Sequence, residues 1–144
     1  MSYDLMAFNK DVAPKNRKDF MEWYRQQTKW EEKHSYDDPK NTSKELNDFF
    51  LAMIKKFPAM HGPFASDDCD DPKVTDYSIG KDVIYSAFAW SIAEDAYKEM
   101  FQKAKENNVG FFDVSANNGD KLFPNEKGNF LPIEKMGKPW WKFW

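Results

Sequence analysis

Apolar residues occupy both faces of one short stretch of the chain, Asp82–Trp90. A strand with one face in water alternates apolar and polar residues, whereas here only Ser86 interrupts the apolar pattern with a small polar side chain. We therefore expect this stretch to be a strand in the interior of a sheet, with both of its faces covered.

Four further stretches have the character of strands. They are short and rich in strand-forming residues, and turn residues such as Gly80-Lys81 and Asn117-Asn118-Gly119 separate them. The expected strands are Tyr3–Phe8, Val74–Ile79, Phe111–Ser115 and Lys121–Phe123.

Three segments repeat apolar residues at helical spacing. The first expected helix is Arg17–Glu32, which turns an aromatic stripe toward the core. The second follows the capping box Thr42-Ser43-Lys44-Glu45, with the threonine as its cap, and ends before Pro58. The third follows the capping box Ser91-Ile92-Ala93-Glu94 and ends at Asn107–Gly110.

Two stretches are expected to lack regular structure. Met60–Lys73 is a long loop, and loops of that length often carry function. The last twenty residues contain several glycines and prolines and end in a cluster of aromatic residues. We expect one α+β domain at residues 1–124 and an irregular aromatic tail at residues 125–144.

The order of these elements predicts an α+β fold of the split βαβ (ferredoxin-like) type with a doubled first crossover. Its antiparallel or mixed sheet is expected to have four to five strands. In that topology the first and third strands lie centrally, and right-handed crossovers place the helices mainly on one face. The other face then needs a cover, which could be a helix, the aromatic tail, a second copy or a partner.

Composition narrows the classes of function. The chain has 144 residues, enough for one domain with its own core, and its 41% hydrophobic and 31% charged residues are typical of a soluble globular protein. Aromatic residues make up 17%, which favours a binding surface. The net charge of −3 disfavours nucleic-acid binding and favours a basic partner.

The cysteine content and the hydropathy of the sequence indicate the cellular compartment of the protein. The single cysteine, Cys69, excludes an internal disulfide and a cysteine-based zinc cluster, which favours a reducing compartment. The sequence shows no apolar run of membrane-spanning length, and its first residues do not resemble a signal peptide. We expect a cytoplasmic protein without membrane contact.

The sequence contains no clear motif for catalysis or for metal binding. Cys69 with His34 and His61 could form a nucleophile and base, but the aspartates around Cys69 oppose a thiolate. Those same aspartates lack the alternating ligands and the central glycine of an EF-hand loop. We therefore expect no catalytic residue, no metal and no cofactor, and we favour a protein that is not an enzyme.

Acidic loops and terminal aromatic residues are the candidate contact residues. The acidic loops are either solvated or a docking surface for a basic partner. The terminal tryptophans either pack on the sheet or anchor an interface. The acidic candidates are Asp37, Asp38, Asp67, Asp68, Asp70 and Asp71, and the terminal ones are Trp140, Trp141 and Trp144.

Several stretches within residues 1–115 resemble a known group of bacterial proteins. Tyr3-Asp4-Leu5-Met6-Ala7-Phe8, Asp76-Tyr77-Ser78-Ile79-Gly80, Phe88-Ala89-Trp90 and Gly110-Phe111-Phe112-Asp113-Val114-Ser115 are similar to stretches in small uncharacterised bacterial proteins. Proteins of this kind are found as immunity proteins beside polymorphic or contact-dependent toxins. The resemblance carries no catalytic residues, and it implies neutralisation of a toxin by masking its active site or another surface that it needs.

Two functional hypotheses follow, and a plain structural subunit is the third possibility. The first is a non-enzymatic protein that binds a basic toxin domain through the acidic loops and occludes it. The second is a small-molecule-binding or enzymatic domain, either a monomer or a homodimer, with a pocket on the uncovered face of the sheet. The residues expected to line that pocket are Tyr77, Tyr85 and Trp90.

Overall fold

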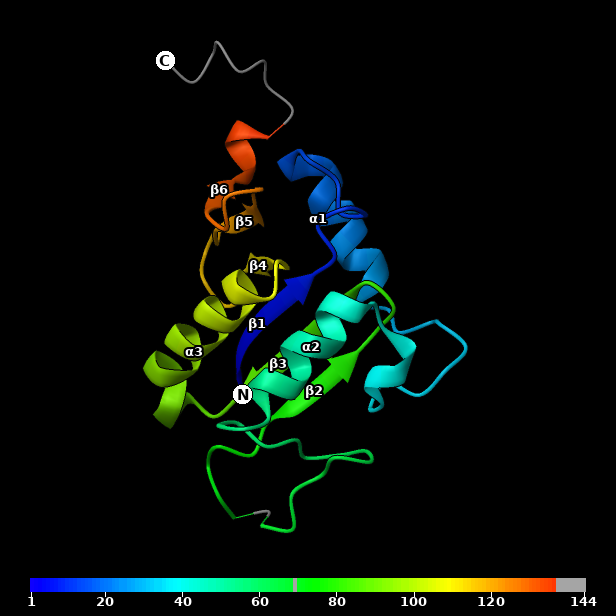
Figure 1. The fold of residues 1–144 in the computed structure, drawn as a ribbon, viewed down its shortest axis with the longest axis vertical. Helices are drawn as coiled ribbons and strands as arrows, with labels where there is room; N and C mark the ends of the chain where they lie inside the picture. Colours follow the sequence, from blue (N-terminus) through cyan, green and yellow to red (C-terminus); the bar gives the residue numbers. More distant parts are fainter. Residues whose placement is uncertain (69, 137–144) are drawn as a thin grey trace.

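The computed structural model describes residues 1–68 and 70–136, which form an α+β fold around one six-stranded antiparallel sheet (Figure 1). The strand order across the sheet is β2-β3-β1-β4-β5-β6. The strands are β1 (Tyr3–Phe8), β2 (Asp76–Ile79), β3 (Val83–Phe88), β4 (Gly110–Phe112), β5 (Lys121–Pro124) and β6 (Phe130–Pro132). The α-helices are α1 (Arg17–Gln27), α2 (Lys44–Met53) and α3 (Ala93–Glu106).

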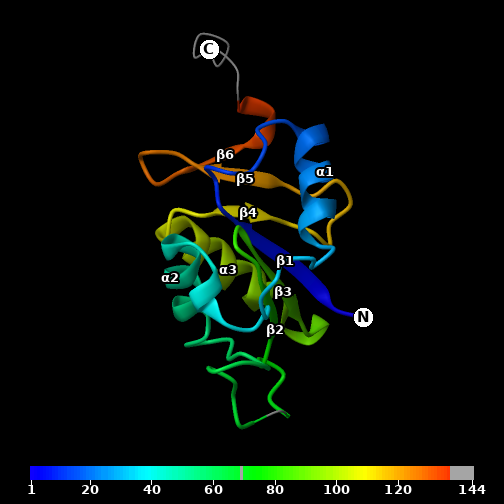
Figure 2. The ribbon, with the colours of Figure 1, turned by 90° about the vertical axis from the view of Figure 1, so that its right-hand side faces the viewer.

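Helices lie on both faces of this sheet. α2 and α3 lie together on one face, and α1 lies on the other, beside the end formed by β4, β5 and β6 (Figure 2). β1 pairs with β3 and β4, and Leu5, Met6, Ala7 and Phe8 in it are fully buried. Because side chains alternate along a strand, Leu5 and Ala7 face α2 and α3, whereas Met6 and Phe8 face α1.

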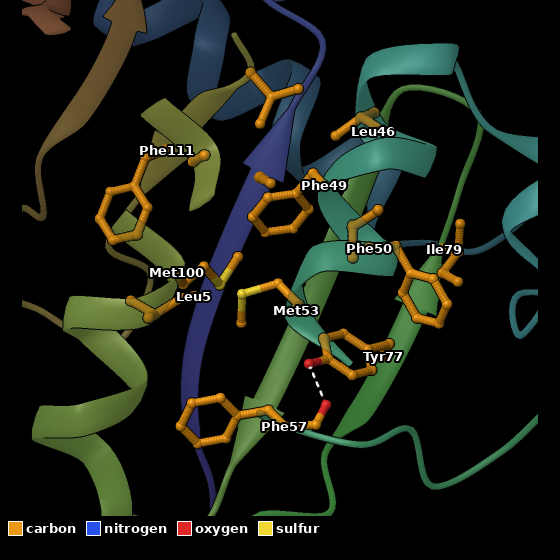
Figure 3. Packing of buried hydrophobic residues seen from close by; sticks show 14 of the residues in the cluster. Leu5, Leu46, Phe49, Phe50, Met53, Phe57, Tyr77, Ile79, Met100 and Phe111 are labelled. Carbon is orange, nitrogen blue, oxygen red and sulfur yellow. Dashed lines mark hydrogen bonds between the residues drawn. The ribbon is translucent and has the colours of Figure 1, made fainter. Parts of the chain in front are cut away.

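The core beneath α2 and α3 is built from large apolar side chains (Figure 3). Phe50 and Met53 of α2 lie on one side of the helix because they are three residues apart, and α3 adds Met100. Phe50 meets the ring of Tyr77 edge to face, with centroids 5.2 Å apart. Tyr77 donates its hydroxyl hydrogen bond to the Phe57 carbonyl at 2.7 Å, so its polar atom is satisfied inside the core.

The core beneath α1 centres on Phe8. Its ring lies 5.0 Å from the ring of Phe20 on α1 and 5.0 Å from that of Phe123 on β5, both in edge-to-face contact. α1 begins beside this cluster because the Asn16 side chain accepts the backbone N–H of Asp19 at 2.9 Å. Burying each such phenylalanine contributes about 1.5–3 kcal/mol of stability.

Two helix termini differ from the sequence prediction. α1 ends at Gln27, five residues before the expected Glu32. Ser43 is the cap of α2, accepting the Leu46 N–H at 3.3 Å, whereas Thr42 donates its hydroxyl to the Lys81 carbonyl at 3.0 Å. Thr42 was therefore the wrong choice of cap, because it serves a contact between distant segments.

The second capping box, Ser91–Glu94, was also a wrong prediction. Trp90–Ile92 forms a short 3-10 turn instead, and α3 begins at Ala93 after a residue that makes no capping bond through its side chain. Two acidic residues in the first turn, Glu94 and Asp95, interact favourably with the positive end of the helix dipole in its place.

The α+β class is confirmed, but the detailed sheet prediction is wrong. The described sheet has six strands rather than four to five, and α1 crosses to the face opposite α2 and α3. The described sheet as a whole therefore differs from the ferredoxin-like sheet of four to five strands that was predicted. β6 and the 3-10 turn Ile133–Lys135 lie in a segment expected to be irregular. β3 does lie inside the sheet, as its apolar pattern predicted, and β1 does so too, as the predicted order of elements required.

The contact between β1 and β4 generates a prediction. A methyl group added at Gly110 would overlap the ring of Phe8, which is fixed in the core. We expect Gly110→Ala to lower the free energy of unfolding by about 1–3 kcal/mol, measured by urea denaturation. Gly80→Ala is the control, since its nearest neighbour would be the Val83 side chain at 3.4 Å. Equal stability of the two variants would contradict the packing described.

Candidate binding pocket

α1 leaves part of its sheet face uncovered. It lies beside β4, β5 and β6 (Figure 2). The face of β2 and β3 beyond its C-terminal end carries a pocket of about 310 Å³. We call this the α1–β2 pocket. Its lining residues are Tyr24, Thr28, Trp30, Asp76, Ser78, Tyr85 and Ala87.

Trp30 forms one wall of the pocket from an unusual backbone conformation. Its φ angle is +54°, a left-handed value that costs a bulky residue about 1–2 kcal/mol. The position follows the end of α1, where Thr28 caps the helix and donates its hydroxyl to the Tyr24 carbonyl at 2.9 Å. Glycine or asparagine would fit this turn better, so local conformation alone does not explain a tryptophan here.

The segment after Trp30 is fastened to the sheet. The Ile79 N–H, at the end of β2, donates to the Tyr36 carbonyl at 2.7 Å, and the Lys81 N–H donates to the Glu32 carboxylate at 3.0 Å. The indole of Trp30 packs edge to face on Tyr36, with ring centroids 5.1 Å apart. These contacts hold the tryptophan wall over the edge of the sheet.

The floor of the pocket is a hydrogen-bonded tyrosine. Tyr85 of β3 donates its hydroxyl to the Asp4 carboxylate of β1, and its ring lies 6.2 Å from that of Trp30. Burial, followed by the bond to Asp4, raises the pKa of Tyr85 above its ordinary value, and burial also raises the pKa of Tyr24. Both phenols therefore stay protonated and serve as hydrogen-bond donors rather than bases.

Acidic side chains extend the pocket along β2. A second cavity of about 220 Å³ shares Asp76 and Ser78 with the first, and we call it the edge pocket. It adds Asp37 and His61, and Gly62 packs so closely that a methyl group there would overlap the Asp37 carbonyl. The loop after α2 thus meets the loop before it. The described residues that line the two cavities include no lysine or arginine.

This arrangement suits recognition of a cation. Aromatic faces attract ammonium and guanidinium groups, and Asp76 supplies the opposite charge. The lining residues of the α1–β2 pocket include no cysteine, lysine or histidine that could act as a nucleophile or base at neutral pH.

Within residues 1–68 and 70–136, no group of three or more His, Cys, Asp and Glu residues is arranged to hold a metal. No helix among these residues is sufficiently long and apolar to cross a membrane.

The acidic residues singled out from the sequence do not gather at one site. Three of them shape their own turns: Asp38, Asp68 and Asp71 accept backbone N–H groups of Lys40, Asp70 and Lys73 at 3.0, 3.2 and 2.9 Å. Asp67 and Asp70 are exposed, and their segment extends beyond the end of the sheet (Figure 1). Only Asp37 lines a cavity with another acid, Asp76.

The predicted aromatic residues separate as well. Tyr85 lines the α1–β2 pocket, whereas Tyr77 is buried on the other face beneath α2 and reaches only the edge pocket. Trp90 is 52% exposed and packs on Tyr3, with centroids 5.1 Å apart, so it lines neither cavity. Of the three aromatic residues, Tyr85 alone lines the α1–β2 pocket, and Tyr77 lines the edge pocket.

The remaining candidates lie outside the pocket or outside the described residues. His34 is bonded to the Glu32 carboxylate and the Ser35 carbonyl, and the bond to Ser35 is the main reason that its pKa is raised. Cys69, Trp140, Trp141 and Trp144 lie outside the residues that the structure describes.

Sequence reasoning missed the three pocket residues that, with Tyr85, supply its aromatic and acidic lining. Tyr24 and Trp30 were assigned to one helical stripe against the core, and Asp76 was overlooked as a strand residue. A signal did exist for Asp76: it alternates with Tyr77 in β2, as a residue facing away from the core does. The left-handed turn at Trp30 had no such signal.

The chain was compared with family models, curated proteins and solved structures. No family model, curated protein or solved structure matches this chain.

The buried phenols generate a prediction about pH. A raised pKa means that the folded protein favours the protonated phenol, so this stability is present below pH 10 and is lost as pH rises through the folded pKa. We expect the free energy of unfolding of the wild type to fall above pH 10.

Tyr85→Phe tests this account of the pocket floor. The variant should lose stability at neutral pH, by about 1 kcal/mol, because Asp4 loses its donor. Its stability should then decline less steeply above pH 10 than that of the wild type. Urea denaturation at neutral and alkaline pH measures both effects, and an unchanged alkaline slope would contradict the burial of the Tyr85 hydroxyl.

Proposed function

We propose that this chain is a non-catalytic binding domain whose α1–β2 pocket receives a cationic side chain of a basic partner protein. The observation that carries the proposal is the aromatic and acidic lining, with Trp30 held over the sheet at a φ angle of +54°. Partner binding of this kind fits the resemblance to immunity proteins, in which occlusion neutralises a toxin. The net charge of −3 would aid encounter with a basic surface.

The position of the pocket favours a protein partner. β2 is one of the two edge strands of the described sheet, and the two cavities run along it from Trp30 to His61. A lysine or arginine can lay its methylene stem against Trp30 and Tyr85 while its charge reaches Asp76. Neighbouring residues of the partner would then extend into the edge pocket, where Asp37 offers a second carboxylate.

We also propose a finer description of the fold around this site. Strands β2-β3-β1-β4, with α2 and α3 as the connecting helices, would form a split βαβ unit. α1 and the β5–β6 hairpin would then be additions to that unit. The binding site lies where one of these additions, α1, ends.

A small organic cation is the second candidate. The volume of about 310 Å³ is at the lower end of the range for small-molecule sites, and three aromatic residues line the pocket. A quaternary ammonium compound would make cation–π contacts without needing a hydrogen-bond donor. In this second candidate function, the small cation occupies the α1–β2 pocket in place of a side chain from a protein partner.

Choline and its neutral isostere 3,3-dimethyl-1-butanol test the charge preference. Titrations followed by two-dimensional amide NMR should show saturable shifts of the Trp30 indole and Tyr85 signals with choline, at roughly millimolar affinity. The neutral isostere has the same shape, so it should bind much more weakly. Equal binding of the two compounds would mean that the pocket recognises only apolar shape and not charge, which would refute the proposal.

Two variants place this binding in the pocket. Asp76→Asn removes the charge and keeps the shape, so it should weaken choline binding severalfold, whereas Asp67→Asn, at an exposed position outside both cavities, should not. Trp30→Gly should abolish binding, and relief of the left-handed strain should offset only part of the stability lost with the packing of the indole. An unaffected affinity in both pocket variants would contradict the assignment.

A tetralysine peptide distinguishes the two occupants. For a basic protein partner, the peptide should bind more tightly than lysine amide, and added salt should weaken it. Asp37→Asn should reduce this gain, since only the longer probe reaches the edge pocket. If choline binds and the peptide gains nothing over lysine amide, the small-cation function replaces the protein-binding one.

A further inference from the structure

A buried lysine lines a separate cavity at the other end of α1. Lys121 of β5 is 2% exposed, and it is one of the residues around a pocket of about 150 Å³ that we call the Lys121 pocket. Arg17 and Met21, in the first half of α1, lie on the same pocket. The α1–β2 pocket lies beyond the C-terminal end of this helix, so the two sites are distinct.

The ammonium group of Lys121 lacks a close counterion. Its Nζ donates to the Gly119 carbonyl at 3.1 Å and lies 4.5 Å from the centre of the Phe112 ring. Among the described residues, no carboxylate lies within the 4.0 Å of an ion pair with it. The carboxylate of Glu134 is instead bonded to Arg17. Buried charges are ordinarily paired, so this lysine is an exception that calls for an explanation.

Unused hydrogen-bond donors meet at the pocket. An ammonium has three donors, of which the Gly119 carbonyl takes one, and a guanidinium has five. Arg17 contacts Glu134 and donates to the Asn118 side-chain oxygen at 2.8 Å, which holds its planar group in place. The effect of burial, followed by that of nearby Arg17, lowers the pKa of Lys121, and an anion between the two cations would relieve both costs.

Apolar side chains form the wall opposite these polar groups. Met21, Phe112, Val114 and Ala116 form the other walls. A phosphate or sulfate ion would lose hydration on that side without gaining a hydrogen bond, whereas a short alkyl chain would fit it. The volume of about 150 Å³ admits only a few non-hydrogen atoms.

We infer that the Lys121 pocket binds a short aliphatic carboxylate, with its carboxylate between Lys121 and Arg17 and its alkyl chain against Met21 and Phe112. The carboxylate accepts charge-assisted hydrogen bonds from both cations. The alkyl end takes the place of water beside the apolar wall.

Propionate and its neutral isostere propionamide test this site. Titration of the full chain with sodium propionate, at constant ionic strength held with sodium chloride, should give saturable amide NMR shifts at Asn118 and Gly119. Propionamide should bind at least about tenfold more weakly, since it lacks the charge. No saturable shift with propionate, equal binding of propionamide, or tighter binding of phosphate would each overturn the inference.

Lys121→Met is the matching variant. Methionine fills a similar volume without a charge, so the chain should remain folded, as its amide spectrum will show. Propionate affinity should fall at least about tenfold, whereas Lys135→Met, at an exposed lysine outside the pocket, should keep it. Should the methionine variant fail to fold, Arg17→Met removes the other cation of the pocket at a partly exposed position, and propionate affinity should fall in the same way. Unchanged affinity in whichever of these two variants folds would refute the site.

Discussion

The pairing of β1 with both of its neighbours is the constraint on which the rest of the structure depends. Leu5, Met6, Ala7 and Phe8 are fully buried and alternate between two separate cores. A shift of one residue in the register would exchange the two cores, so the alignment of Phe8 with Gly110 on β4 is strongly specified. The glycine leaves room for the phenylalanine ring, and that ring in turn positions Phe20 and α1.

The candidate pocket follows from the place where α1 ends. If the helix continued to Glu32, Trp30 would lie seven residues after Trp23, on the same stripe. Instead the chain turns after Thr28, and the indole moves to the edge of the sheet beside Tyr85. The energetic cost of the left-handed turn is therefore tied to the formation of an aromatic wall.

The two pockets at the ends of α1 differ in electrostatic character. The lining of the α1–β2 pocket carries one carboxylate and no lysine or arginine, whereas the lining of the Lys121 pocket carries two cations. This contrast arises around one helix on one sheet face, because the α1–β2 pocket lies beyond the C-terminal end of α1 and the Lys121 pocket lies beside its first half. The two proposals are therefore independent, although the same helix supports both.

Much of the fold was predictable from local patterns. The buried strands follow from continuous apolar runs, and α2 follows from the spacing of Leu46, Phe49, Phe50 and Met53. α1 was assigned correctly as a helix, but its face of the sheet depends on packing with Phe112 and Phe123, which no local pattern reveals.

The sites were less predictable for the same reason. Tyr85 was predicted as a lining residue, because its strand carries apolar side chains on the sheet face that the expected helices leave uncovered. In the structure Tyr85 is half-buried and lines the pocket. Asp76, Trp30 and Lys121 come from three distant segments, so only the tertiary structure brings them to their cavities. The aspartates of the long loop stood out in composition, yet several bond to their own turns.

The most direct test of the central claim is the position of a bound cation in the α1–β2 pocket. Intermolecular nuclear Overhauser effects between the methyl protons of choline and the protein would give that position. The account predicts contacts to the indole of Trp30 and the ring of Tyr85, which face the same cavity. Contacts to the exposed ring of Trp90 instead, or no contacts at saturating choline, would contradict it.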